Sequence, residues 1–262
     1  MVHKKRKAVL HYHDVMLEET DMDTLEEGQW LNDNIMSFYM EYMERQVIPI
    51  ETSDMLLLRP TMSQLIAHTP GKWPLYREGL TVVMIDESFV LSLVTGNPKD
   101  LVGVLPPHID KKRLIFVPIN NGTPETANNG THWALLVYSR PTNTFYYYDS
   151  LHSTNIDEGE RTSKRMIPLL GTGKALLSKV KPPAFTPVST PQQSNGTDCG
   201  LMVIAIMDRL IKQAMRCDTD NALEIDHPNK IRSPNDTRSV LKSLIRELQR
   251  KAKSASPTSF SL

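Results

Sequence analysis

A long apolar run follows directly on a cysteine near the C-terminal end of this chain. Residues 201–207 read LMVIAIM, and the triplet Asp198-Cys199-Gly200 comes immediately before them. We predict a very apolar helix with Cys199 in its first turn. The first backbone N–H groups of a helix are unpaired and its dipole is positive there, which favours a thiolate. Cys199 is therefore a candidate nucleophile.

Two further polar residues stand at the ends of strand-like segments. His132 precedes the apolar segment 133–138, and Asp149 follows the segment 145–148. The polar, proline-containing turn 139–144 predicts that the two strands form an antiparallel hairpin. The start of one strand and the end of its partner then lie at the same end of the sheet. His132 and Asp149 can therefore touch, as a base and the carboxylate that orients it.

Strand patterns occupy the middle of the chain, with helical patterns before and after them. Apolar residues at helical spacing begin after Asn32 or Asp33, either of which would cap the helix. This grouping favours an α+β domain over repeated strand–helix–strand units. Section 69–107 mixes Pro and Gly with apolar runs, and we assign it no element. The expected helices cover 30–46, 158–170, 199–215 and 237–253, and the expected strands cover 113–119, 133–138 and 145–148.

The chain is predicted to form one catalytic domain between two short tails. Residues 1–9 contain the basic run Lys4-Lys5-Arg6-Lys7, and residues 254–262 are rich in Ser and Pro without periodicity, so we expect both to be flexible. No repeat or clear linker divides the part between them. The domain is therefore placed at 10–253, and we expect it to be a monomer.

Composition excludes several classes of protein. The 30 basic residues balance the 30 acidic ones, which argues against nucleic-acid binding. No apolar stretch has the length of a membrane span, and no apolar segment of a signal peptide follows the basic start. Two cysteines, Cys199 and Cys217, are too few for a disulfide framework. We therefore expect a cytoplasmic or nuclear protein with neither a structural metal nor a cofactor.

Four short motifs follow one another along the chain: Trp30-Leu31-Asn32-Asp33, His132-Trp133, Asp149-Ser150, and Gln193 followed by Asp198-Cys199-Gly200. Together they resemble the signature of the Ulp-type cysteine proteases, which process ubiquitin-like modifiers. The resemblance covers roughly residues 25–215 and implies a papain-like fold, with a central, mostly antiparallel sheet flanked by helices. One isolated Asp-Cys-Gly would be weak support, because a cysteine at an apolar helix start is more often a packing residue.

This resemblance implies a role for each matching residue. Cys199, His132 and Asp149 would form a catalytic triad, and the family offset from the cysteine selects Gln193, rather than Gln192, as the oxyanion donor. In the family's pattern Trp30, Asp33 and Trp133 contact the Gly-Gly tail of the modifier. A carboxylate at Asp33 suits a basic residue just before the two glycines.

Within the family, the segment around the histidine is most similar to the deneddylase branch. The segments 112–121 and 131–138 and the extended loop 122–130 between them carry this similarity, whereas SUMO proteases of the family have a shorter loop. The implied partner is a Nedd/Rub modifier with its conjugates, such as cullin-type targets. SUMO cleavage is the alternative, and a binding module without catalysis is a more distant one.

Several of these residues also have simpler interpretations. Trp30 and Trp133 are compatible with ordinary core or rim positions, and Cys217 is expected to be inert. His152 is a second candidate base because it lies close to Asp149 in the sequence. The cluster of His11, His13 and Asp14 resembles a metal site only superficially.

Overall fold

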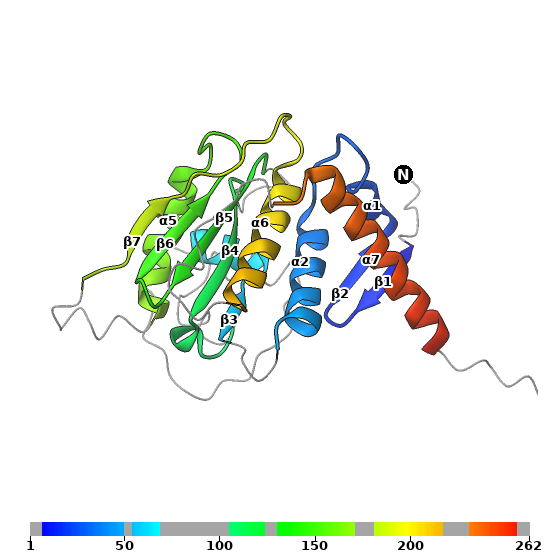
Figure 1. Ribbon diagram of the computed structural model, residues 1–262, viewed down its shortest axis with the longest axis horizontal. Helices are drawn as coiled ribbons and strands as arrows, with labels where there is room; N and C mark the ends of the chain where they lie inside the picture. Colours follow the sequence, from blue (N-terminus) through cyan, green and yellow to red (C-terminus); the bar gives the residue numbers. More distant parts are fainter. Residues whose placement is uncertain are drawn as a thin grey trace, which may run out of the picture.

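A five-stranded sheet forms the centre of the computed structural model, with strand order β3-β4-β5-β6-β7 (Figure 1). The two inner pairings, β4 with β5 and β5 with β6, are antiparallel, as predicted for the hairpin. The two outer pairings are parallel, so the sheet is mixed rather than mostly antiparallel. The strands are β3 (Met55–Leu57), β4 (Leu114–Asn120), β5 (Trp133–Ser139), β6 (Thr144–Tyr148) and β7 (Ala184–Pro187).

The structure describes residues 7–49, 54–68, 105–123, 130–170, 181–216 and 231–255. Most of section 69–107, most of the loop 122–130, and Cys217 lie outside these ranges.

Strand β5 is the middle strand and is buried along its whole length. Alternate side chains of β4 and β5 point to opposite faces of the sheet, as the two-residue period of a strand requires. Phe116 and Val137 pack on the face covered by α6 (Cys199–Ala214), whereas Val117 and Leu136 pack on the face covered by α5 (Ile156–Met166) and α3 (Pro60–His68). The sheet therefore lies between two helical layers.

Helix α6 is the cysteine helix of the sequence prediction, and nearly all of its residues are buried. A helix that is apolar on all sides must be enclosed. It packs against β5, α2 (Asp33–Tyr42) and α7 (Pro234–Ala255). Helix α2 continues into a π-helical turn, η1 (Met43–Val47), and a 3-10 turn, η5 (Ile167–Leu170), extends α5. A further 3-10 turn, η4 (Ile109–Lys111), precedes β4.

An N-terminal hairpin lies apart from the main sheet, beside α2 and α7 (Figure 1). It consists of β1 (Ala8–Tyr12) and β2 (Val15–Glu18) and is followed by the short helix α1 (Glu19–Asp23). The predicted tail 1–9 is therefore two residues too long, because Ala8 and Val9 already belong to β1. At the other end α7 continues to Ala255, beyond the predicted limit at 253.

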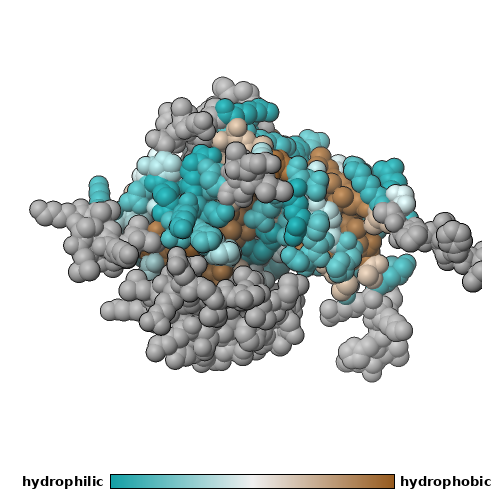
Figure 2. All heavy atoms as spheres, turned by 90° about the horizontal axis from the view of Figure 1, so that it is seen from below, coloured by the Kyte–Doolittle hydropathy of each residue, from teal (hydrophilic) through white to brown (hydrophobic). Residues whose placement is uncertain are grey.

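Hydrophilic side chains cover much of the described surface seen from below (Figure 2). The large apolar side chains that stay exposed are scattered among several elements, and Trp30 is the most exposed of them at 50%. Within the described ranges no helix is long and apolar enough to cross a membrane.

Candidate active site

The predicted catalytic residues meet where β5 begins, β6 ends and α6 begins. His132 immediately precedes β5, and Asp149 immediately follows β6. Because these strands are antiparallel neighbours, with Leu135 opposite Tyr148, the two side chains reach each other. His132 Nε2 lies 2.7 Å from Asp149 Oδ1. The hairpin geometry expected from the sequence is confirmed.

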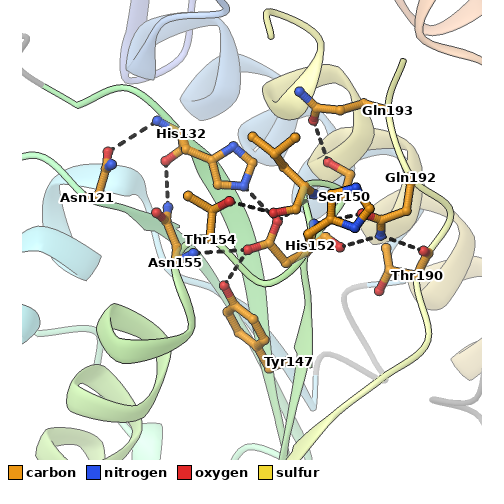
Figure 3. A network of polar contacts seen from close by, with 12 residues as sticks. Asn121, His132, Tyr147, Ser150, His152, Thr154, Asn155, Thr190, Gln192 and Gln193 are labelled. Atoms are coloured by element: carbon orange, nitrogen blue, oxygen red, sulfur yellow. Dashed lines mark hydrogen bonds and ion pairs between the residues drawn. The ribbon is translucent and has the colours of Figure 1, made fainter. Parts of the chain in front are cut away.

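The Asp149 carboxylate receives four hydrogen bonds. Besides His132, the hydroxyl of Tyr147 donates to Oδ2 at 2.7 Å, the N–H of Leu151 to Oδ1 at 2.8 Å, and the N–H of Asn155 to Oδ2 at 3.1 Å (Figure 3). Burial would raise the pKa of the Asp149 carboxyl, but these donors outweigh it and hold the pKa below its usual value. The carboxylate thus stays charged and fixed in one orientation.

His132 is buried, and its position is fixed from both sides of its backbone. The side-chain amide of Asn155 donates to the His132 carbonyl at 2.8 Å, and the His132 N–H donates to Asn121 Oδ1 at 3.1 Å (Figure 3). Burial lowers the pKa of His132, but its interactions with Asp149 and with Cys199 outweigh this and raise the pKa to about 9. Because Nε2 faces Asp149, the interaction with Cys199 falls on Nδ1, which has no other hydrogen-bond partner among the described residues. That nitrogen is available to take the thiol proton.

Cys199 is the first residue of α6, and Asp198 is its N-cap. The thiol therefore lies beside the unpaired N–H groups of the helix start, as predicted. The glycine that follows is required by close packing. A Cβ on Gly200 would stand 2.7 Å from Leu31 Cβ and 3.4 Å from the Trp133 ring. Only glycine lets the start of α6 approach the segment that carries Trp30.

The structure distinguishes the two adjacent glutamines. Gln193 Oε1 accepts the hydroxyl of Ser150 at 2.7 Å (Figure 3). Its Nε2 donates to the Asn195 carbonyl at 2.6 Å, which leaves a second amide hydrogen for a ligand. Gln192 instead donates to the Asp149 carbonyl at 3.1 Å and accepts the N–H of His152 at 2.7 Å. Gln193 can thus act as an oxyanion donor, while Gln192 braces the turn after Asp149.

The three predicted tail-binding residues have different environments. The Trp30 indole N–H donates to the Gly196 carbonyl at 2.9 Å, so this half-exposed ring lies against the segment before Cys199. Trp133 is only 5% exposed, and its N–H donates to the Leu31 carbonyl at 3.1 Å. Trp133 is therefore also a core residue. Asp33 is exposed in the first turn of α2, and Asn32 caps that helix through Ile35 N–H at 3.0 Å.

The other histidine candidates do not join the catalytic group. His152 is exposed, and it is His132 that contacts Asp149. His11, His13 and Asp14 are exposed on the β1–β2 hairpin. Within the described part of the chain, no group of three or more His, Cys, Asp or Glu side chains could hold a metal ion.

Sequence reasoning missed Tyr147, Asn155 and the support of Asp198 by Arg238. The strand period offered a signal for Tyr147, since it lies two residues before Asp149 and so shares its face. Asn155 follows in an irregular turn, where no period applies. Arg238, on α7, donates from Nη2 to Asp198 Oδ1 at 2.9 Å. No local pattern links residues so distant in the sequence.

Comparison with known proteins gives consistent results. Residues 92–233, more than half of the chain, match the Ulp1 protease family, C-terminal catalytic domain. The probable sentrin-specific protease 8 of Dictyostelium discoideum is 31% identical over 81% of this chain and 79% of its own length. The NEDD8-specific protease 1 of Arabidopsis thaliana is 28% identical over 75% of this chain and 72% of its own.

Among solved structures, the C-terminal Ulp1 protease domain in complex with Smt3, the yeast orthologue of SUMO, superposes with a TM-score of 0.58. It is 20% identical and covers 94% of this chain and 89% of its own. This likeness confirms the predicted α+β fold of the Ulp type.

Proposed function

This chain belongs to the Ulp1 protease family of cysteine peptidases, and on that premise we propose that it cleaves after the C-terminal Gly-Gly of a Nedd/Rub modifier. The observation that carries the proposal is the meeting of the His132–Asp149 pair with Cys199 where β5 begins and β6 ends. The choice of modifier is supported by the relatives in Arabidopsis and fission yeast that are named NEDD8-specific proteases.

In the proposed reaction, His132 Nδ1 takes the thiol proton of Cys199 while Asp149 holds the ring through Nε2. The thiolate attacks the carbonyl carbon of the last glycine, and the leaving amine takes its proton from the imidazolium. The product is a thioester between Cys199 and the modifier. Water, deprotonated by His132, then hydrolyses this thioester and restores the free thiol.

The oxyanion of the tetrahedral intermediate would be stabilised by the Gln193 side-chain amide and by backbone N–H groups near Cys199. Ser150 fixes the Gln193 amide in advance, so no reorientation is needed during the reaction. Donors fixed before the reaction act most strongly in a site that excludes water.

Gln193→Ala should therefore lower kcat by about 10² to 10³, as loss of one oxyanion donor does in other acyl-transfer enzymes. KM should change little, because the donor acts in the transition state. Steady-state kinetics on a fluorogenic modifier substrate measure both values. Gln192→Ala is the matched comparison and should have the smaller effect, and a larger loss at Gln192 would reverse the assignment.

Specificity is expected to depend on the tail and on the surface that receives it. A Nedd/Rub tail ends in Leu-Arg-Gly-Gly, and its arginine would suit the exposed carboxylate of Asp33. The usual SUMO tail ends in Gln-Thr-Gly-Gly and offers no charge there. Trp30 and Trp133 would enclose the glycines, with Trp30 already placed against the cysteine segment.

Modifier probes with a C-terminal electrophile test this proposal directly. The Nedd/Rub probe should label Cys199 faster than the SUMO and ubiquitin probes under the same conditions, and Asp33→Ala should reduce that preference. Mass spectrometry identifies the labelled residue. Faster labelling by the SUMO probe would exclude the Nedd/Rub assignment, while labelling by none would favour a binding module without catalysis.

We also propose that the substrates include conjugates of cullin-type proteins and that the enzyme acts as a monomer in the cytoplasm or nucleus. Resemblance to the deneddylase branch supports the first proposal. Low cysteine content, typical of proteins from reducing compartments, supports the location.

A further inference from the structure

A buried ion pair adjoins the proposed nucleophile. Asp198 precedes Cys199 in the chain, and its side chain is almost wholly enclosed. Arg238 Nη2 donates to Asp198 Oδ1 at 2.9 Å, and Asn195 Nδ2 donates to Oδ2 at 2.8 Å. Arg238 comes from α7 and is only 6% exposed. Two charges that are costly to bury are therefore held together at the start of α6.

The same guanidinium reaches a second segment of the site. Arg238 Nη1 donates to the carbonyl of Glu26, in the segment that leads to Trp30. Arg238 thus joins α7 both to the nucleophile helix and to the proposed tail-binding segment. Helix α7 lies beyond residues 92–233, the part that matches the family. A residue outside the matched domain consequently contacts the residue next to Cys199.

Charge explains why the pair matters for a thiolate. A lone carboxylate next to Cys199 would repel the negative charge that forms on sulfur, and the repulsion would be strong because water is largely excluded. The guanidinium cancels this charge. Other charged or titratable side chains also lie near Cys199 or Arg238. His132 interacts with Cys199 and has Asp149 behind it, and on the outer side Glu26 pairs with Lys242 at 2.8 Å.

We propose that Arg238 is a positioning residue for the reaction, which neutralises Asp198 and so keeps the Cys199 thiol reactive. The inference rests on the proposed role of Cys199 as nucleophile, but not on the identity of the modifier. Arg238 acts through Asp198 and not by contacting the substrate.

Alkylation of Cys199 by iodoacetamide at pH 7 measures thiol reactivity without any modifier, and mass spectrometry reports it for this cysteine in a Cys217→Ala background. Because iodoacetamide is neutral, its rate follows the thiolate population. Arg238→Met should slow the reaction by about tenfold, the effect of one uncompensated charge in a partly dry site. The double variant Asp198→Asn, Arg238→Met should return to within about threefold of the reference, because no lone charge remains.

The double variant separates charge from packing. The alternative is that Arg238 acts only by holding α7 to the Glu26 carbonyl. In that case the added Asp198→Asn change would not restore the reactivity of Cys199, since the Glu26 carbonyl would still lack its donor. Arg238→Lys retains the charge and should stay near the reference rate. If Arg238→Met fails to fold, Arg238→Lys and the double variant provide the test. Slow alkylation in both of these variants overturns the proposal.

Arg232→Met is the matched control, because Arg232 pairs with Asp208, which lies on α6 farther from its start than Cys199. It removes another arginine–aspartate contact, at an aspartate that also pairs with Lys212 and lies away from the nucleophile, and should leave the alkylation rate unchanged. Equal slowing by Arg232→Met, or an unchanged rate in folded Arg238→Met, overturns the proposal. A failure of the modifier probes with these alkylation results intact would contradict only the proposed substrate.

Discussion

Cys199→Ala should abolish cleavage of a Nedd/Rub substrate while the protein stays folded and still binds the modifier. Loss of the nucleophile lowers kcat by about six orders of magnitude in comparable acyl-transfer enzymes. The structural cost is small, because the change removes one sulfur atom from the first position of α6 and alanine is a good helix former. Kinetics on a fluorogenic substrate, a thermal melt and a binding titration with the intact modifier measure the three properties.

Cys217→Ala is the control for that experiment. It makes the same chemical change at the other cysteine of the chain and should leave cleavage unaltered. Activity that survives in Cys199→Ala, or disappears in Cys217→Ala, would show that the nucleophile is assigned wrongly. A Cys199 variant that loses modifier binding as well would indicate that the sulfur supports the structure of the tail-binding segment.

The sequence predicted the catalytic geometry where local rules apply. His132 and Asp149 flank a hairpin, and antiparallel pairing leaves little freedom in where their side chains meet. The cysteine helix was equally predictable, because a continuous apolar run of this length excludes an exposed helix. Strand period and turn chemistry therefore bring His132 and Asp149 together, whereas their grouping with Cys199 was implied by the family resemblance.

Features that depend on distant segments were not predictable in this way. Strand β7 lies in the proline-rich connection 182–191, and it forms because it completes an edge of the sheet beside β6. Proline is tolerated at such an edge. The parallel outer pairings follow from long connections whose course no local pattern sets. Trp133 could not be classed as rim or core from its neighbours, and the structure places it in the core.

Adjacent residues of one type show the same limit on a smaller scale. Gln192 and Gln193 are chemically identical, and only their partners, Asp149 and Ser150, give them different roles. The support of Asp198 by Arg238 joins positions 40 residues apart. Such pairs depend on how helices pack, and a single sequence without coordinates does not specify that packing.

Asp149→Asn should lower kcat by about 10⁴, as the equivalent change does in a serine protease triad, with little change in modifier binding. The amide carries no charge and cannot accept at both positions where Tyr147, Leu151, Asn155 and His132 now donate. His132 therefore loses both its charge partner and its fixed orientation. Asp157→Asn, the same change at an exposed site in the first turn of α5, is the matched control and should leave kcat unaffected.

The pH dependence gives the sign of the electrostatic effect. In the unmodified enzyme the imidazolium of His132 should persist until the pH approaches its raised pKa of about 9, so activity falls as pH rises through that value. In Asp149→Asn the interaction of the imidazolium with the carboxylate is gone, while the interaction with Cys199, which raises this pKa, and burial, which lowers it, both remain. The residual activity should therefore decline at a distinctly lower pH. An alkaline limb that stays in place in the variant would mean that Asp149 orients the ring without stabilising its charge.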